Sequence, residues 1–231
     1  MGGLRRDMSI PDENRAVVRS LTWHTPDIFE LGVEHPGCAF VPGDCVALYQ
    51  RQGTASRPYS IASGIHDETW RFLIRRLPGG EVSADLAQCA PGDSVRITPP
   101  FGWFRPGQDA SGSSAVFVAT GTGIAPFWSY LRSYPDRPPV RCLYGVRQRA
   151  DAVAVEWLRE RCCLDLAVSR ETAPDARHGR VTDLLPSLPL DGATHYYLCG
   201  LDTMLDDVSR WLEVRGVGLA RIHRECFFNA Q

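Results

Sequence analysis

Residues 57–63 read Arg-Pro-Tyr-Ser-Ile-Ala-Ser, and the fold of the first half of the chain can be worked out from this stretch outward. It follows an apolar segment at 45–49, which predicts a strand, and a short polar turn at 50–56. Side chains alternate between the two faces of an extended strand. We therefore expect Arg57 and Tyr59 to project to one side and Ser60 to the other.

The three side chains have the chemistry to hold a flavin nucleotide. The planar fork of Arg57 can donate parallel hydrogen bonds to a phosphate. Tyr59 can lie against a flat ring, and the hydroxyl of Ser60 can bond a ring heteroatom. The alternative interpretation is an exposed arginine beside a tyrosine that packs in the wall of a barrel.

The composition indicates a globular protein with room for two cores. The chain has 231 residues, of which 44% are hydrophobic, and its net charge of −2 gives no support for nucleic-acid binding. No apolar run approaches the ~18 residues that a membrane span needs. Residues 1–14 carry no apolar stretch after their arginines, so we expect a tail without a secretory signal and a cytoplasmic protein.

Two residue types narrow the chemistry further. All 25 basic residues are arginine, which excludes Schiff-base catalysis and a P-loop lysine. The eight cysteines contain no C-x-x-C pair, so we predict neither a metal site nor an iron–sulfur cluster.

Between residues 15 and 107 the pattern is one of short strands separated by glycine and proline turns. This spacing favours an antiparallel β-barrel, with one short helix near 82–88. Besides 45–49, the expected strands are 16–23, 28–33, 70–76 and 94–97.

From residue 113 to 231 the rhythm changes to alternating strands and helices, after a polar linker at 108–113. Such alternation predicts a parallel sheet with helices on both faces. The expected strands are 115–120, 140–144, 164–168 and 194–199; the expected helices run through 130–132 and over 151–161 and 203–215.

Two glycine turns have the features of phosphate-binding loops. Residues 121–126, Gly-Thr-Gly-Ile-Ala-Pro, follow the first strand of the second domain, and their glycines let backbone N–H groups approach a pyrophosphate. They do not form the dinucleotide G-x-G-x-x-G fingerprint, because Pro126 takes the place of the third glycine. Residues 78–83, Pro-Gly-Gly-Glu-Val-Ser, lead into the predicted helix of the barrel domain, where Ser83 could instead be an ordinary N-cap.

Four motifs now stand in order along the chain: residues 57–60, 80–83, 121–126, and the pair 198–200 with 224–228. Together they resemble the ferredoxin–NADP reductase family, whose corresponding motifs are Arg-x-Tyr-Ser, Gly-Gly-x-x-Ser and Gly-Thr-Gly-x-Ala-Pro. The segment 99–102 resembles the family's Gly-Pro-x-Gly, with Pro99 in place of the first glycine. The resemblance covers about residues 15 to 229.

The resemblance implies a two-domain flavoenzyme: an FAD-binding barrel at 15–107, followed by an NADP-binding α/β domain at 113–231. FMN remains the alternative flavin. It implies Ser60, Cys199 and Glu225 as the catalytic residues, with Phe227 or Phe228 covering the flavin. The implied cofactor-binding residues are Arg57, Pro58, Tyr59, Ser60, Arg75, Gly80, Val82, Ser83, Gly121, Thr122, Gly123, Pro126, Arg147, Ser169, Arg170, Arg180, Cys199, Gly200 and Phe227.

NADP(H) is predicted over NAD(H) from the ends of the second-domain strands. Ser169 and Arg170 follow the third strand, Arg147 follows the second, and Arg180 comes soon after. Arginine forks and a hydroxyl are the expected lining for a 2′-phosphate.

The expected function is hydride transfer between NADP(H) and FAD, and single-electron transfer to a separate carrier such as ferredoxin or flavodoxin. Two alternatives remain: the reductase component of an oxygenase system, and a non-catalytic electron-relay subunit. We expect a monomer.

Overall fold

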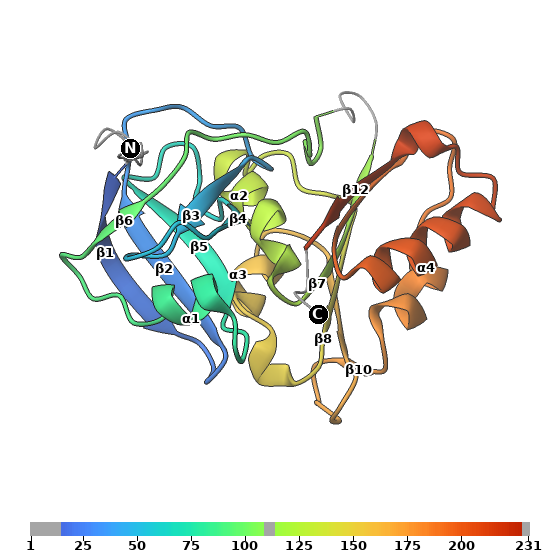
Figure 1. The fold of residues 1–231 in the computed structure, drawn as a ribbon. Coiled ribbons are helices and arrows are strands. Elements are labelled where there is room, and N and C mark those ends of the chain that lie inside the picture. The colour runs from blue at the N-terminus through green and yellow to red at the C-terminus, as the bar shows by residue number, and fades with distance from the viewer. Residues whose placement is uncertain (1–14, 109–113, 228–231) are drawn as a thin grey trace, which may run out of the picture.

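The structure, a computed structural model, describes residues 15–108 and 114–227. Its first part is an antiparallel barrel (Figure 1), built from β1 (Arg15–Trp23), β2 (Ile28–Glu34), β3 (Cys45–Tyr49), β4 (Ser56–Ser60), β5 (Thr69–Arg75) and β6 (Ser94–Arg96). One short helix, α1 (Glu81–Leu86), lies between β5 and β6.

Two sheets close the barrel. One has the strand order β5-β2-β1-β6, and the other pairs β3 with β4. Isolated β-bridges join the two sheets at both edges. One bridge pairs Leu48 with Ile97, and the other pairs Ile61 with Phe72. Apolar residues from all six strands fill the interior, as the alternation of buried and exposed positions requires.

The second part is a six-stranded parallel sheet with the order β10-β9-β8-β7-β11-β12. Its strands are β7 (Ala115–Thr120), β8 (Arg141–Val146), β9 (Leu164–Val168), β10 (Arg177–His178), β11 (His195–Gly200) and β12 (Ile222–Cys226). The chain order reverses between β7 and β11. In open α/β sheets, ligands bind at such a reversal, outside the carboxyl ends of the strands.

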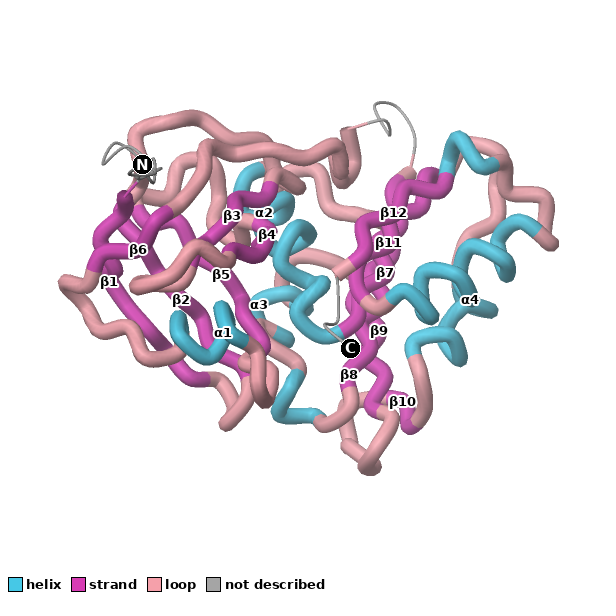
Figure 2. Tube along the Cα trace, viewed as in Figure 1, coloured by secondary structure: helices cyan, strands magenta, loops and turns pink. Residues whose placement is uncertain are grey.

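Helices cover both faces of this sheet (Figure 2). α2 (Ala125–Ser133) and α3 (Val155–Arg159) pack on the face turned toward the barrel, and α4 (Asp202–Glu213) packs on the other. No helix among the described residues has the length and apolarity to cross a membrane.

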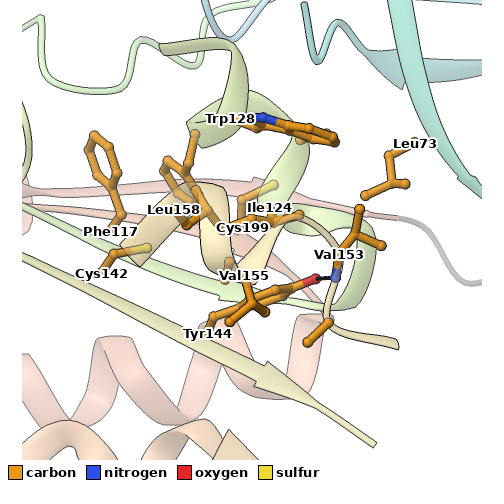
Figure 3. Close-up of a cluster of buried hydrophobic side chains, with 14 of the residues drawn as sticks. Leu73, Phe117, Ile124, Trp128, Cys142, Tyr144, Val153, Val155, Leu158 and Cys199 are labelled. Carbon is orange, nitrogen blue, oxygen red and sulfur yellow. Dashed lines mark hydrogen bonds between the residues drawn. The ribbon is translucent and has the colours of Figure 1, made fainter. Parts of the chain in front are cut away.

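The two domains share a core. Leu73 and Phe104 of the barrel domain belong to the same buried cluster as Trp128 and Val153 of the sheet domain. Figure 3 shows Leu73 opposite Val153, whose N–H donates to the Tyr144 hydroxyl at 3.4 Å. The contact between the two domains is therefore part of the hydrophobic core of the protein.

Hydrogen bonds add to the junction. The buried Ser129 hydroxyl of α2 donates to the Ser63 carbonyl at 2.7 Å, and Arg132 Nε donates to Asp67 Oδ2 at 2.9 Å. The loop that follows β4 is thereby fixed to the second domain.

The structure differs from the sequence prediction in several elements, among them the short strand β10, which was not predicted. The helix predicted at 151–161 is only Val155–Arg159, because Ala154 adopts a left-handed φ of 59° and the helix begins after it. β12 was not predicted as a strand, although its five residues pair in parallel with β11.

Candidate active site

Ser60 is the last residue of β4, and its hydroxyl points into the protein. The side chain is 5% exposed, whereas Arg57 on the same strand is exposed. Across the β3–β4 pair, Ser60 lies opposite Cys45. The predicted separation of Arg57 from Ser60 on the strand therefore agrees with their burial.

Two neighbouring strands of the second domain bring Cys199 and Glu225 to this hydroxyl. The two residues are register partners on β11 and β12. The Ser60 hydroxyl donates to Glu225 Oε2 at 3.3 Å, and the Cys199 thiol donates to the same oxygen at 3.8 Å. Residues from both domains, 165 positions apart at the widest, thus meet at one carboxylate oxygen.

Burial dominates the electrostatics of this Ser60–Cys199–Glu225 cluster. It raises the pKa of Glu225 to about 7, against the hydrogen bonds from Ser60 and Cys199, which lower it. Burial also raises the pKa of the Cys199 thiol well above its ordinary value. Cys199 is therefore a neutral donor, and Glu225 can take up or release a proton near neutral pH.

The glycine turn after β7 lies directly beside the cluster. A side chain at Gly123 would meet the Cys199 carbonyl at 2.4 Å, and one at Gly200 would meet the Thr120 hydroxyl at 2.1 Å. Gly121 has a φ of +54°, and no atom lies within 4 Å of the place where its Cβ would stand. The turn is thus packed against the protein at Gly123 and leaves open space at Gly121, where a phosphate can approach the backbone.

The flavin-binding residues predicted on the barrel present the expected groups. Arg57 is exposed, with Nη1 donating to the Ser56 carbonyl at 2.8 Å, and Pro58 beside it is exposed as well. Tyr59 is half-buried, and burial raises its pKa to about 12, so its ring is a neutral surface. These positions fit a phosphate and a flat ring.

The structure does not support the alternative interpretation of Ser83 as the N-cap of α1. Gly80 is the residue that caps α1, and Ser83 lies inside the helix. The Ser83 hydroxyl accepts a hydrogen bond from the Leu77 N–H at 3.1 Å, and Val82 is buried. The role of Gly80, Val82 and Ser83 in binding a pyrophosphate stays a prediction that rests on their backbone.

Two further predicted residues lie at the junction. Arg75 Nη2 contacts the buried Asp151 Oδ2 of the second domain at 3.4 Å, so in this structure its charge joins the domains. Phe227 packs against the shared core, and its N–H donates to the Gly200 carbonyl at 2.9 Å. Phe228, its predicted alternative, lies outside the described residues.

The residues predicted for the 2′-phosphate gather at the carboxyl edge of β8, β9 and β10. The Arg170 N–H donates to the Arg147 carbonyl at 2.9 Å, and the Ser169 hydroxyl donates to the Val146 carbonyl at 3.3 Å. Arg180 follows β10 and, like Arg147 and Arg170, has an exposed side chain. The three guanidinium groups thus come from adjacent strand ends.

Both halves of the chain match known families. Residues 15–105 match a protein-family model described as Oxidoreductase FAD-binding domain, and residues 117–210 match one described as Oxidoreductase NAD-binding domain. The chain belongs to the ferredoxin–NADP reductase-like family. The predicted barrel and parallel-sheet domains are therefore confirmed as an FAD domain and an NAD(P) domain.

The curated relatives described next are longer than the chain. It is 32% identical over 206 residues to the toluate 1,2-dioxygenase electron transfer component of Pseudomonas putida, covering 82% of this chain and 59% of that protein. It is 29% identical over 191 residues to ferredoxin–NADP reductase A of Sorangium cellulosum, covering 69% of this chain and 67% of that protein. The chain thus spans about three fifths of the toluate component.

Solved structures of the family have the same fold. An Amycolatopsis cytochrome P450 reductase superposes with a TM-score of 0.83 at 27% identity, over 94% of this chain and 70% of that one. A Neisseria gonorrhoeae ferredoxin NADP+ reductase with bound FAD and NADP superposes with a TM-score of 0.84 at 22% identity, over 93% of this chain and 98% of that one.

The sequence did not reveal two ion pairs, one next to Cys45 and one at the domain junction. Asp44 and Arg105 form an ion pair at 2.8 Å near Cys45, and Asp151 pairs with Arg75. Each pair joins residues more than 60 positions apart, so no local pattern connects them. The one signal was Asp44 itself, a carboxylate at the start of an otherwise apolar strand.

Proposed function

We propose that this chain transfers hydride between NADPH and bound FAD and passes single electrons to a separate protein carrier of the ferredoxin or flavodoxin type. The observation that carries the proposal is the meeting of Ser60, Cys199 and Glu225 at one carboxylate oxygen. This cluster lies at the reversal of the strand order, where the FAD and NAD(P) domains join.

The chain would hold its two cofactors with separate sets of residues. The exposed Arg57 and the half-buried Tyr59 would hold the phosphate and ring of FAD, and the Gly121–Gly123 turn would hold the pyrophosphate of the nicotinamide nucleotide. When bound, the flavin supplies a ring that accepts hydride and releases electrons one at a time.

The Ser60–Cys199–Glu225 cluster would hold the Glu225 carboxyl group in place and provide a group that binds and releases a proton. Ser60 and Cys199 are buried, so they exclude water from this end of the junction. Their two hydrogen bonds fix Glu225 Oε2, and the carboxyl group can hold a proton below about pH 7.

The choice of NADPH over NADH rests on Arg147, Arg170 and Arg180. These arginines follow adjacent strands at one sheet edge, and a 2′-phosphate carries about two negative charges that guanidinium groups can pair with.

A second candidate is the reductase component of an oxygenase system. It is favoured by the names of several relatives, such as the toluate and the 2-halobenzoate 1,2-dioxygenase electron transfer components. In that case the carrier is one that serves an oxygenase.

The test is a dye-reduction assay on the purified chain reconstituted with FAD. We expect NADPH to reduce ferricyanide, and the Cys199→Ser and Ser60→Ala variants to lower kcat while FAD stays bound. A flavin-loaded chain that oxidises neither NADPH nor NADH would contradict the proposal and favour a non-catalytic relay subunit. Comparing ferredoxin, flavodoxin and an oxygenase as acceptors then separates the two candidates.

A further inference from the structure

A partly buried ion pair lies beside the Ser60–Cys199–Glu225 cluster. Arg105 Nη2 contacts Asp44 Oδ1 at 2.8 Å, and Asp44 is 6% exposed. The other carboxylate oxygen of Asp44 accepts the Val41 N–H at 2.9 Å. Arg105 also donates to the Phe104 and Gly102 carbonyls, at 2.8 and 2.9 Å. Both side chains are therefore held in place by several hydrogen bonds.

The pair is attached to the strands that position Ser60. Asp44 directly precedes Cys45, the register partner of Ser60. The Asp44 carbonyl accepts the Ile61 N–H at 3.0 Å, so the backbone of Asp44 is bonded to the residue that follows Ser60. The ion pair thus adjoins the Cys45–Ser60 register pair. Ser60 is in turn bonded to Glu225, whose own hydrogen-bond partners, Ser60 and Cys199, are neutral.

We propose that Arg105 and Asp44 are positioning residues that adjust the protonation of Glu225 without touching the reacting atoms. The inference rests on the proposed function, because the proton of Glu225 matters only if that group serves the reaction. The guanidinium of Arg105 stabilises the carboxylate form of Glu225, and the carboxylate of Asp44 destabilises it. The pair therefore balances two opposite effects on one proton.

The pKa directions agree with this division. Arg105 lowers the pKa of Glu225, and Asp44 raises it. The same two groups act on the Cys45 thiol in the same directions: Asp44 raises its pKa, and Arg105 lowers it. The titratable, charged or hydrogen-bonding groups around Glu225 are Cys45 on β3, Ser60 on β4, Cys199 on β11, Cys226 on β12, and Asp44 and Arg105.

The test is a direct titration of Glu225 by carbon-13 NMR of its carboxyl carbon, in the full chain without cofactors. Asp44→Asn leaves Arg105 unbalanced, so we expect the pKa of Glu225 to fall by about 0.5–1 unit. Arg105→Leu leaves Asp44 unbalanced, so the pKa should rise by a similar amount. The pH profile of NADPH oxidation by the loaded enzyme should move in the same two directions.

Three controls separate charge from structure. Arg105→Lys keeps the cation, and the double variant Asp44→Asn with Arg105→Gln removes both charges, so each should titrate close to the wild type. Asp67→Asn with Arg132→Gln removes another ion pair of the domain junction, at 2.9 Å, and should leave Glu225 unchanged.

The outcomes distinguish this inference from the proposed function. Shifts in the same direction for Asp44→Asn and Arg105→Leu, or none in either, would show that the pair is only a structural clasp. A wild-type chain that titrates as expected but oxidises no NADPH would overturn the proposed function instead.

Discussion

Two carboxyl groups in different regions of the molecule have pKa values that are shifted in opposite directions. At the domain junction, burial raises the pKa of Glu225 to about 7. At the outer edge of the parallel sheet, a hydrogen bond from Arg149, supported by Arg159, lowers the pKa of Asp175 to about 2. The same chemical group is therefore a proton store in one place and a permanent anion in the other.

The difference lies in the partners and in access to water. Glu225 receives its hydrogen bonds from a hydroxyl and a thiol, which carry no charge to offset the loss of solvent. Asp175 is exposed and accepts bonds from two guanidinium groups, at 2.9 Å from Arg149 Nη2 and 2.9 Å from Arg159 Nη1. Among the described residues, Glu225 has no direct ion pair. Asp175 instead belongs to an exposed ion-pair network with Arg149, Arg159 and Glu156.

The largest effect should follow from removing the titrating group. Glu225→Gln should lower kcat for NADPH-dependent dye reduction on the order of 10²-fold, the lower end for a lost acid–base group. The pH dependence centred near 7 should disappear as well. Glu156→Gln, in the exposed ion-pair network, is the matched control and should leave kcat unchanged. An active Glu225→Gln variant with an unaltered pH profile would remove Glu225 from the reaction.

The same variant gives a stability test with a defined sign. Because the folded-state pKa of Glu225 is raised from 4.5 to about 7, its contribution to stability is complete below 4.5 and is lost as the pH rises through 7. The Tm of the wild type should therefore fall more between pH 5 and pH 8, on the order of a few degrees, than that of Glu225→Gln.

A smaller effect should come from the sheet edge that carries the predicted 2′-phosphate site. Arg170→Ala should lower kcat/KM for NADPH about tenfold, from the loss of a charge-assisted contact of ~1.5–3 kcal/mol. Turnover of NADH should barely change. Arg210→Ala, in the last turn of α4 on the other face of the sheet, is the control. A wild-type enzyme that uses NADH as well as NADPH would show that this edge does not select the cofactor.

The smallest effect should come from the exposed ion-pair network that Asp175 forms with Arg149 and Arg159. Asp175→Asn should lower stability at neutral pH by only about 0.2–1 kcal/mol, as is typical of exposed pairs, and high salt should reduce the difference. Because the folded-state pKa of Asp175 is lowered, its contribution is present above 3.8 and is lost as the pH falls through 2. Thermal melts at neutral and acid pH check this; a difference that persists at pH 2 would indicate a packing role.

Strands were the most predictable part of the fold. The runs 45–49, 115–120 and 164–168 are strands with these same bounds, because each is an apolar run bounded by polar or turn residues. β12 was missed because His223, Arg224 and Glu225 carry no apolar signal, and its strand character comes from pairing with β11. The strand conformation of β12 is therefore determined by its pairing with β11 and not by its local sequence pattern.

The cluster itself could be predicted only through the family motifs, which supplied Ser60, Cys199 and Glu225 together. The distances between them depend on two domains docking through a shared core, which no local spacing encodes. The same reason explains why the Asp44–Arg105 and Arg75–Asp151 pairs were not foreseen: their members come together only after the barrel has closed or the domains have joined.

β12, which delivers Glu225, is the last described strand in the chain and pairs only with β11 at the edge of its sheet. A ribosome releases residues in chain order, and domains generally fold as they emerge. The barrel and the strands β7 to β11 can therefore fold while Glu225 is still inside the exit tunnel. A nascent chain can therefore acquire both nucleotide-binding surfaces before the carboxyl group that completes the Ser60–Cys199–Glu225 cluster has left the ribosome.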